Sequence, residues 1–369
     1  MSNALRRVSP LLRPLQRLSI RTFSALRRLL NRSGHWIDDR PRLARWVYPR
    51  EDADLAADYG AFNGQMFADF HEHERMLSDR PRMAFYRAAI TRHVHAGDHV
   101  IDLGTGTGIL AALASRAGAG EVHALDHSEI LDHARTLAQA NGITNITFVS
   151  THSTAFTLDR RVDVILHEQM GDCLFDEAMV TNVSDLRKRL LKPGGRIVPS
   201  CFDLFCEPIQ IRDERVVPFL WDLDVPGYDY SSLERSRPQD PRYYRLCSTD
   251  RNLVAHYLGE TAPALSIDLH TADDSTLPSE LRVVRTVTRP GRLDGYAVYF
   301  RARVDDDLSL DTGPLSPGRA PHWGFRILRT DTRQLALGDR LELHLRVERW
   351  SDLDTWRWST DVTRAACSA

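Results

Sequence analysis

The chain has 369 residues, of which 42% are hydrophobic and 27% are charged. This composition is typical of a soluble globular protein, and the length indicates about two domains. The 48 basic and 50 acidic residues give a formal net charge of -2, which argues against a nucleic-acid-binding protein because such domains are usually basic. The sequence lacks a run of about 18 apolar residues, so no transmembrane segment is expected.

Metal-binding and disulfide frameworks are not indicated either. The five cysteines are odd in number and form no Cys-x-x-Cys pair: Cys173, Cys201, Cys206, Cys247 and Cys367. We therefore expect a reducing compartment and a cytoplasmic protein. The run His71-Glu72-His73-Glu74 lacks the His-Glu-x-x-His spacing of a zinc enzyme, so no metal site is expected.

The N-terminal region is rich in arginine. Residues 1–35 contain eight arginines and no acidic residue. Three interpretations stay open: a tail that is disordered or weakly helical, an amphipathic segment at a membrane surface, and an organelle presequence. Of these, we favour the tail, and we treat residues 1–55 as an Arg-rich N-terminal extension of that kind. Residues 56–95 are expected to be helical, with Pro81 at a helix start.

Strands and helices then alternate along the chain. Strands are predicted at residues 100–103, 122–126, 146–149, 162–166 and 196–198. Helices are predicted at 109–116, from 128 to 141 with Ser128 as the N-cap, and at 177–191. This alternation is typical of a parallel sheet with helices on both faces, so residues 56–200 are expected to form a doubly wound, Rossmann-like α/β domain.

The pattern changes after about residue 200. Strand-like runs occur there without long helices between them, at residues 281–287, 296–304, 341–347 and 356–362. We therefore expect residues 201–369 to form a mostly antiparallel β-barrel or sandwich domain. The Pro-containing stretch 236–241 is expected to be a loop or an insertion.

A glycine-rich turn follows the first predicted strand. Gly104, Gly106 and Gly108 have the spacing G-x-G-x-G, which lets a ligand approach the backbone closely. The spacing differs from that of nicotinamide-binding folds, and the Lys-Ser/Thr of a phosphate-binding loop is absent. Asp126 ends the second strand, where a carboxylate can accept both hydroxyls of a ribose. Together with Asp102, these residues resemble the class I S-adenosylmethionine-dependent methyltransferases, although glycines alone also fit a purely structural turn.

A second motif follows the fourth predicted strand. Residues 167–179 read His-Glu-Gln-Met-Gly-Asp-Cys-Leu-Phe-Asp-Glu-Ala-Met. Ligands of doubly wound sheets bind outside the carboxyl ends of the strands, so Glu168 and Glu177 are expected where a substrate meets the cofactor. Two carboxylates can bind a planar guanidinium through paired hydrogen bonds. A surface loop with two solvated glutamates is the alternative.

The segment resembles the double-glutamate loop of the protein arginine N-methyltransferases, through Glu168, Met170, Gly171, Leu174, Glu177 and Met179. Three more segments resemble motifs of that family in the same order: 73–86, 225–229 and Pro321-His322-Trp323. The resemblance covers about residues 59–365. The sequence departs from the family at a Tyr-Phe-x-x-Tyr motif and in the substrate loop, at Asn63, Gly64, Phe67, Gln169 and Asp172.

The resemblance implies methyl transfer from S-adenosylmethionine to a guanidino nitrogen of arginine, by positioning and electrostatics. The implied catalytic residues are Glu168, Glu177, His322 and Asp79, with His322 as a proton relay paired with Asp79. The implied cofactor-binding residues are Met76, Arg82, His73, Asp102, Gly104, Gly106, Asp126 and Ser153. Ser153 stands near the place where the family has an acidic residue beside the adenine.

Three kinds of function stay open. The first is methylation of arginine in a protein; the second is methylation of free arginine or a small guanidino metabolite, motivated by Gln169 and by the added carboxylate of Asp172. The third is a catalytically idle, dimeric binding protein. The resemblance also implies a homodimer formed through an arm near residues 207–236, whose apolar run 216–221 favours burial against a partner. No nucleic-acid partner is expected.

Overall fold

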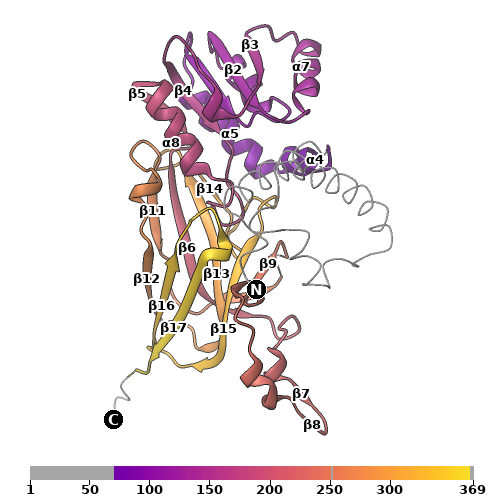
Figure 1. The fold of residues 1–369 in the computed structure, drawn as a ribbon, viewed down its shortest axis with the longest axis vertical. Coiled ribbons are helices and arrows are strands. Elements are labelled where there is room, and N and C mark those ends of the chain that lie inside the picture. The colour runs from indigo at the N-terminus through magenta and orange to yellow at the C-terminus, as the bar shows by residue number, and fades with distance from the viewer. Residues whose placement is uncertain (1–69, 251, 366–369) are drawn as a thin grey trace, which may run out of the picture. The chain divides into compact units, whose positions relative to one another are not determined.

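The computed structural model describes residues 70–250 and 252–365 (Figure 1). All described residues belong to one compact unit. The predictions for the 1–55 extension and for the departures at Asn63, Gly64 and Phe67 lie outside the described residues. No helix of the described part is long and apolar enough to cross a membrane.

Two helices precede the first sheet: α4 (Phe70–Ser78) and α5 (Arg80–His93). Asp79 caps α5, because its side chain accepts a hydrogen bond from the backbone N–H of Arg82. Pro81 lies in the first turn, as predicted, where its missing N–H costs no helical hydrogen bond. The cap fixes the direction in which α5 enters the domain.

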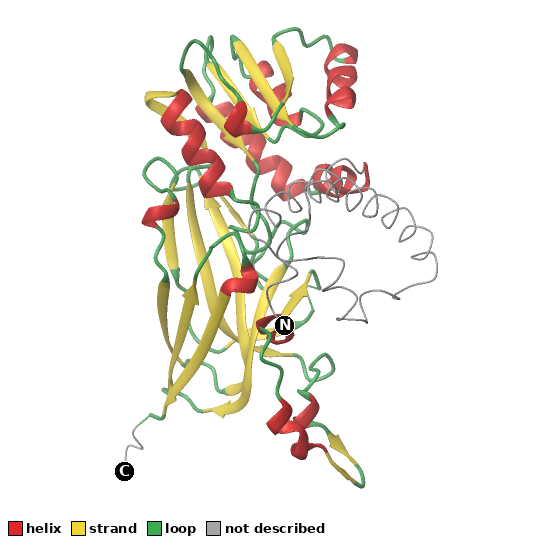
Figure 2. Cartoon of the chain, in the orientation of Figure 1, coloured by secondary structure: helices red, strands yellow, loops and turns green. Residues whose placement is uncertain are grey.

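A five-stranded parallel sheet follows, in the order β3-β2-β1-β4-β5 (Figures 1 and 2). Its strands are β1 (His99–Leu103), β2 (Glu121–Asp126), β3 (Ile146–Ser150), β4 (Val162–His167) and β5 (Leu191–Val198). The connecting helices are α6 (Ile109–Arg116), α7 (Leu131–Ala140) and α8 (Met179–Leu190), with the short η3 (Ser153–Ala155) before β4. The predicted doubly wound sheet is confirmed. Because the strand order reverses between β1 and β4, their carboxyl ends flank the crevice where such folds bind ligands.

Two local predictions are wrong. Ser128 does not cap α7, because its N–H and hydroxyl both donate to the Asp126 carboxylate, and the helix begins at Leu131 without a side-chain cap. The helix predicted from Glu177 begins instead at Met179, since Ala178 has a left-handed backbone with φ 54°. Glu177 therefore lies on the loop before α8.

The C-terminal half is antiparallel, as predicted. A seven-stranded sheet contains the path β10-β6-β13-β15-β9, with β11 paired to β6 and β14 paired to β13. A second, three-stranded sheet has the order β12-β16-β17. The bounds are β6 (Cys201–Ile211), β9 (Arg245–Ser248), β10 (Val254–Tyr257), β11 (Leu265–Asp268), β12 (Glu280–Thr286), β13 (Gly291–Arg303), β14 (Ser309–Asp311), β15 (Phe325–Leu335), β16 (Arg340–Val347) and β17 (Trp356–Thr363), with short turns η7 (Asp274–Thr276) and η8 (Leu353–Thr355).

Between β6 and β9 the chain leaves the sheet in an extension that carries a two-stranded hairpin (Figure 1). It contains η4 (Leu220–Asp222), β7 (Asp224–Val225), β8 (Tyr228–Asp229), η5 (Tyr230–Ser236) and η6 (Pro241–Tyr244). Residues 207–211 still belong to β6, where Glu207 is fully buried and pairs through both carboxylate oxygens with Arg285 at 2.7 and 2.8 Å. We therefore define the arm as residues 212–244.

Candidate active site

Helix α4 lies against the glycine-rich turn that follows β1. Gly104 and Gly106 have φ values of 70° and 54°, in the left-handed region that glycine adopts without strain. A Cβ atom on Gly106 would lie 2.8 Å from Cε1 of His73, and one on Gly104 would lie 3.5 Å from Nε2 of Gln169. The turn thus brings His73, from α4, and Gln169, from the loop after β4, against the carboxyl end of β1.

Two buried carboxylates hold this turn in place. Oδ2 of Asp102 accepts hydrogen bonds from Thr105 Oγ1 at 2.6 Å and from the backbone N–H of Ala111 at 3.0 Å. Burial raises the pKa of Asp102 to about 7. Oδ2 of Asp126 accepts from the Gly106 N–H at 2.9 Å. Among the described residues, the Asp102 side chain hydrogen-bonds only with the turn and with α6, so it supports the turn from within the domain.

Arg82 connects the start of α5 with the loop after β4. Its side chain is buried; Nη1 donates to the carbonyl of Met76 and Nη2 to Oε2 of Glu168, each at 2.9 Å. Its Nε is buried without a hydrogen-bond partner among the described residues. The guanidinium of Arg82 therefore belongs to both the expected cofactor set and the expected substrate set.

The loop of residues 167–179 is tightly folded. A Cβ atom on Gly171 would lie 2.5 Å from the Asp176 carboxylate, and both Leu174 (φ 72°) and Ala178 have left-handed backbones. Non-glycine residues in this region are strained and concentrate at functional sites. The indole Nε1 of Trp323 donates to the Met170 carbonyl at 2.6 Å, so the loop is held by the segment before β15.

Glu168 and Glu177 are both half-buried, and each influences the ionisation of the other. Burial raises the pKa of Glu177 well above its ordinary value, and the neighbouring carboxylates, Glu168 first, raise it further. Burial also raises the pKa of Glu168, although the Arg82 guanidinium opposes this shift. A second cation between the two carboxylates would relieve both effects, which is the electrostatic requirement of a guanidinium clamp.

The structure brings His322 and Asp79 together, although not through the imidazole. Oδ2 of Asp79 accepts a hydrogen bond from the backbone N–H of His322 at 2.9 Å. The ring Nδ1 of His322 is buried and has no partner among the described residues. Burial lowers the pKa of His322 to about 3, and the positive charges of Arg82 and Arg75 act in the same direction. The imidazole is therefore neutral at pH 7.

Both oxygens of the Asp172 carboxylate already have partners within the protein. Its Oδ1 accepts from the Gly324 N–H at 2.7 Å, and its Oδ2 lies 3.3 Å from Nη2 of Arg326 on β15. Arg326 was not among the predicted site residues, because nothing in its sequence neighbourhood distinguishes it from other strand arginines. The engagement of Asp172 removes one of the two observations that favoured a free amino acid as substrate, the other being Gln169.

The remaining predicted residues lie around the same crevice. Met76 and Ser153 are buried, and the Ser153 carbonyl accepts from Nη2 of Arg189 at 2.9 Å. Tyr86, which belongs to the matched N-terminal motif, donates from its hydroxyl to the His167 carbonyl at 3.0 Å and fixes the residue before Glu168. Within the described ranges no group of three or more His, Cys, Asp and Glu side chains is arranged to hold a metal ion.

Comparisons with known proteins show which chains this sequence resembles. A family described as methyltransferase domain matches residues 94–216. The protein arginine N-methyltransferase PRMT10 of Oryza sativa subsp. japonica is 32% identical over 313 residues, which cover 76% of this chain and 81% of that protein. PRMT10 of Arabidopsis thaliana is 29% identical over 330 residues, covering 82% and 86% respectively.

Solved structures show the same architecture. The Trypanosoma brucei PRMT1 enzyme-prozyme complex with AdoHcy superimposes with a TM-score of 0.68 at 25% identity, covering 82% of this chain and 95% of that chain. Arabidopsis thaliana protein arginine methyltransferase 10 gives a TM-score of 0.69 at 24% identity, covering 82% and 96%. Fold and site together define a class I S-adenosylmethionine-dependent methyltransferase. The chain belongs to the protein arginine N-methyltransferase family.

The variant Gly106→Ala tests whether the glycine turn tolerates a Cβ atom next to His73. The substitution places a Cβ against His73 and forces a left-handed alanine, which costs about 1–2 kcal/mol. We expect S-adenosylhomocysteine to bind roughly tenfold more weakly, measured by calorimetry, because the turn or α4 must shift. Gly142→Ala is the matched control: Gly142 has φ 67° and no atom within 4 Å of the added Cβ. Equal affinities of the two variants would contradict the expected role of the turn.

Proposed function

We propose that the chain transfers a methyl group to a guanidino nitrogen of arginine residues in proteins. The observation that carries this proposal is the pair of half-buried carboxylates, Glu168 and Glu177, whose raised pKa values favour binding of a further cation. Guanidinium fits because its planar fork of N–H donors matches carboxylate oxygens. The substrates named for the relatives support the same assignment.

The residues at the crevice also suit the cofactor. When bound, S-adenosylmethionine supplies an electrophilic methyl group on a sulfonium. The buried Nε of Arg82 has a free donor for a carboxylate, and the glycine turn leaves its backbone open to close approach. In our proposal Asp126 holds the ribose, Ser153 lies beside the adenine, and His73 and Met76 cover the site from α4. Asp102 acts as a positioning residue for the turn.

The clamp orients the acceptor nitrogen. A guanidinium has a pKa above about 12, so Glu168 and Glu177 bind it as a cation and bias its electron density toward one terminal nitrogen. The proton is then lost as methyl transfer proceeds. The neutral imidazole of His322 is the proposed acceptor for that proton, and Asp79 positions His322 through the backbone hydrogen bond.

The raised pKa values predict a pH dependence. The clamp binds a cation only when its carboxylates are ionised, so kcat/KM for an arginine peptide should fall as the pH drops through the raised pKa of Glu177 and should level off above it. Peptide binding below that pKa should release a proton. Calorimetry in two buffers of different ionisation enthalpy measures this release. The release should disappear in Glu177→Gln; an unchanged proton release in that variant would assign the titration to another group.

One assay separates the candidate substrates. Cofactor labelled in its methyl group is incubated with an arginine-containing peptide, with the same peptide carrying lysine in place of arginine, and with free arginine. We expect label in the arginine peptide alone. Transfer to free arginine in preference to the peptide would favour a small-molecule enzyme. No transfer to any acceptor, with intact cofactor binding, would favour an idle binding protein.

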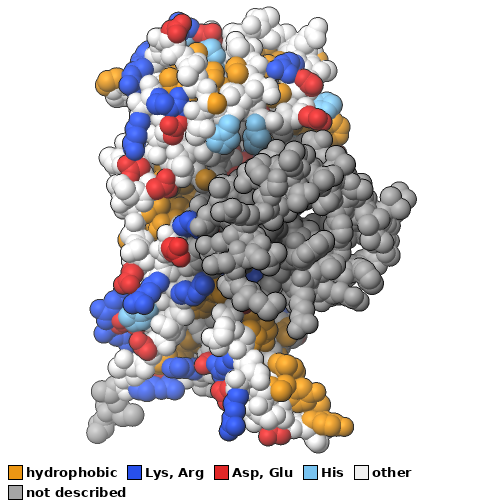
Figure 3. All heavy atoms as spheres, in the orientation of Figure 1, with side chains coloured by type: hydrophobic (Ala, Val, Ile, Leu, Met, Phe, Trp, Pro, Cys, Tyr) orange, Lys and Arg blue, Asp and Glu red, His pale blue; other side chains and the backbone are white. Residues whose placement is uncertain are grey.

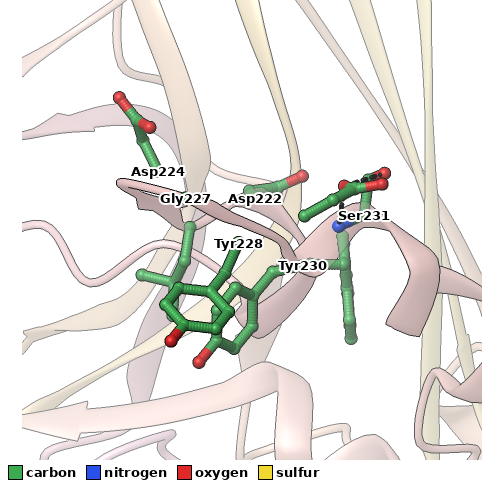
Figure 4. A pocket seen from close by; sticks show the side chains of 9 residues that line it. Asp222, Asp224, Gly227, Tyr228, Tyr230 and Ser231 are labelled. Atoms are coloured by element: carbon green, nitrogen blue, oxygen red, sulfur yellow. Dashed lines mark hydrogen bonds between the residues drawn. The ribbon is translucent and has the colours of Figure 1, made fainter.

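We also propose that the enzyme is a cytoplasmic homodimer assembled through the arm. The arm's Val217 and Tyr228 are exposed by 73% and 74%, whereas Phe219 and Trp221 are buried and stack at 4.9 Å. Residues of η4, β7, β8 and η5 line an open hollow of about 600 Å³, and Tyr228 and Tyr230 are among the side chains that line it (Figure 4). Exposed apolar side chains of this size suit a two-fold contact that buries the same patch twice.

Charged substitutions on the arm should dissociate the dimer. Val217→Glu with Tyr228→Glu places two charges in the proposed interface, and we expect the dimer dissociation constant to rise by roughly tenfold or more. Light scattering at micromolar concentration measures the change. Leu337→Glu is the matched control, since Leu337 is 64% exposed and lies outside the arm. A monomeric mass for the active parent chain would contradict the proposal.

A further inference from the structure

A second cavity lies at the root of the arm, away from the methyltransferase site. It has a volume of about 450 Å³, and its walls come from residues 237–244 of the arm, from β15 and from β17. The charged residues that line it are four arginines and one aspartate: Arg237, Arg329, Arg333, Arg357 and Asp331. In Figure 3, basic side chains gather in the lower part of the view, where Figure 1 places β16 and β17.

The positive charge of this cavity is not compensated within the described chain. Asp331 is paired with Arg237 at 2.8 Å. Arg329 donates to the Val217 carbonyl, and Arg357 donates to backbone carbonyls. Arg333 forms no side-chain hydrogen bond or ion pair with any described residue. Three guanidiniums therefore line one cavity without a carboxylate partner.

The number of guanidiniums favours phosphate over carboxylate as their ligand. A carboxylate offers two oxygens and one charge, whereas a phosphate monoester carries a charge of about −1.5 to −2 on three acceptor oxygens. Arginine is the side chain best suited to such oxygens, because its donors form a rigid fork. The hydroxyl of Thr330 adds a buried polar atom on the same wall that has no partner in the described chain.

The cavity is larger than a phosphate group needs. A volume of about 450 Å³ falls within the range of small-molecule sites. Two half-buried aromatic side chains, Trp358 and Tyr244, form part of the wall. Their positions are fixed, since Trp358 Nε1 donates to the Arg329 carbonyl at 3.0 Å and the Tyr244 hydroxyl donates to the Pro238 carbonyl at 3.0 Å. Such rigid faces suit a ring system beside the phosphate.

We propose that this cavity binds a small organic phosphate that carries a ring, held by Arg329, Arg333 and Arg357 at its phosphate and by Trp358 and Tyr244 at its ring. The site goes beyond the methyl-transfer function and uses none of its residues. Two arginines also join the cavity to the arm: Arg237 lies 4.6 Å from the ring centre of Trp221, and Arg329 lies 3.8 Å from that of Phe219. Ligand binding should therefore stabilise the root of the arm.

The test uses the full chain with saturating S-adenosylhomocysteine, which keeps the cofactor site filled. Calorimetry then compares uridine 5′-monophosphate, uridine and inorganic phosphate. We expect the monophosphate to bind more tightly than inorganic phosphate, and uridine to bind least. Arg333→Gln with Arg357→Gln should weaken monophosphate binding by at least roughly tenfold, because hydrogen bonds to a charged group are lost.

The matched control is Arg340→Gln with Arg346→Gln. These arginines lie on β16, pair with Glu342 and Glu280, and do not line the cavity. The control removes the same charge and should leave the affinity unchanged. If both double variants weakened monophosphate binding equally, the loss of affinity would be due to net charge alone, and the proposed site would be wrong. No binding of the monophosphate at millimolar concentration, or equal binding of uridine and its monophosphate, would overturn the proposal as well. None of these outcomes depends on methyl transfer.

Discussion

Glu177→Gln is expected to lower kcat by roughly 30- to 800-fold while leaving the affinity for S-adenosylhomocysteine nearly unchanged. The variant removes one charge from the clamp, which costs about 2–4 kcal/mol of transition-state stabilisation. Cofactor affinity should be preserved because, within the part of the chain that the structure describes, Glu177 forms no hydrogen bond to the glycine turn or to Arg82. Single-turnover rates and calorimetry measure the two quantities separately.

Glu168→Gln should behave differently, because Glu168 accepts the hydrogen bond from Arg82 at 2.9 Å. Loss of this ion pair leaves a buried guanidinium without its carboxylate, so cofactor affinity and turnover should both fall. Glu74→Gln is the control for the same chemical change at an exposed position, where the side chain is 75% accessible, and it should be neutral. A Glu177→Gln enzyme with high turnover and poor cofactor binding would reverse the proposed roles.

Trp323→Ala is expected to destabilise the fold by about 3–5 kcal/mol, the range for truncation of a large buried aromatic residue. Trp323 is only 2% exposed, packs edge-to-face with Phe300 at 5.6 Å and donates its indole N–H to the Met170 carbonyl. Urea unfolding measures the loss. The effect should reach the clamp, because Met170 follows Glu168 by two residues in the strained loop.

Trp323→Phe separates packing from hydrogen bonding. The ring is retained, but the Met170 carbonyl loses its donor, which costs about 1–3 kcal/mol. Its loss of stability should therefore be smaller than that of Trp323→Ala, while its methyl-transfer rate should still fall. A change of less than about 1 kcal/mol in both variants would show that the loop is held by other contacts.

The strands that were predicted and the strands that were missed differ in the residue types they contain. β1 and β2 contain short apolar runs, and Asp102 and Asp126 lie at or beside their carboxyl ends. β6 was missed because its sequence contains Asp203, Glu207 and Pro208, which are depleted in strands. Partners distant in the chain satisfy these groups: Arg303 lies 3.0 Å from Asp203 and Arg285 pairs with Glu207. β15 was missed for a similar reason, since it carries three arginines and an aspartate.

The residue types of the candidate site were accessible from the sequence, but their partners were not. The motifs identified Arg82 and Glu168 as separate cofactor and substrate residues, yet the two share an ion pair across 86 positions. Asp79 and His322 were expected to pair, with His322 as a proton relay, and their contact uses the backbone N–H of His322. Asp172 was interpreted as an added charge for a ligand, whereas Arg326 and Gly324 engage it. Contacts of this kind depend on three-dimensional packing and leave no local pattern.

The anchoring of the 167–179 loop has a consequence for how the enzyme can be divided. The clamp residues are encoded in the Rossmann-like half, but Trp323, Gly324 and Arg326, which hold the loop, come from the antiparallel half. A fragment that ends near residue 200 would keep every glutamate of the clamp and lose the groups that define its shape. The two halves are therefore not interchangeable modules, and a chimaera that joins this Rossmann-like half to another barrel must carry these three residues with it.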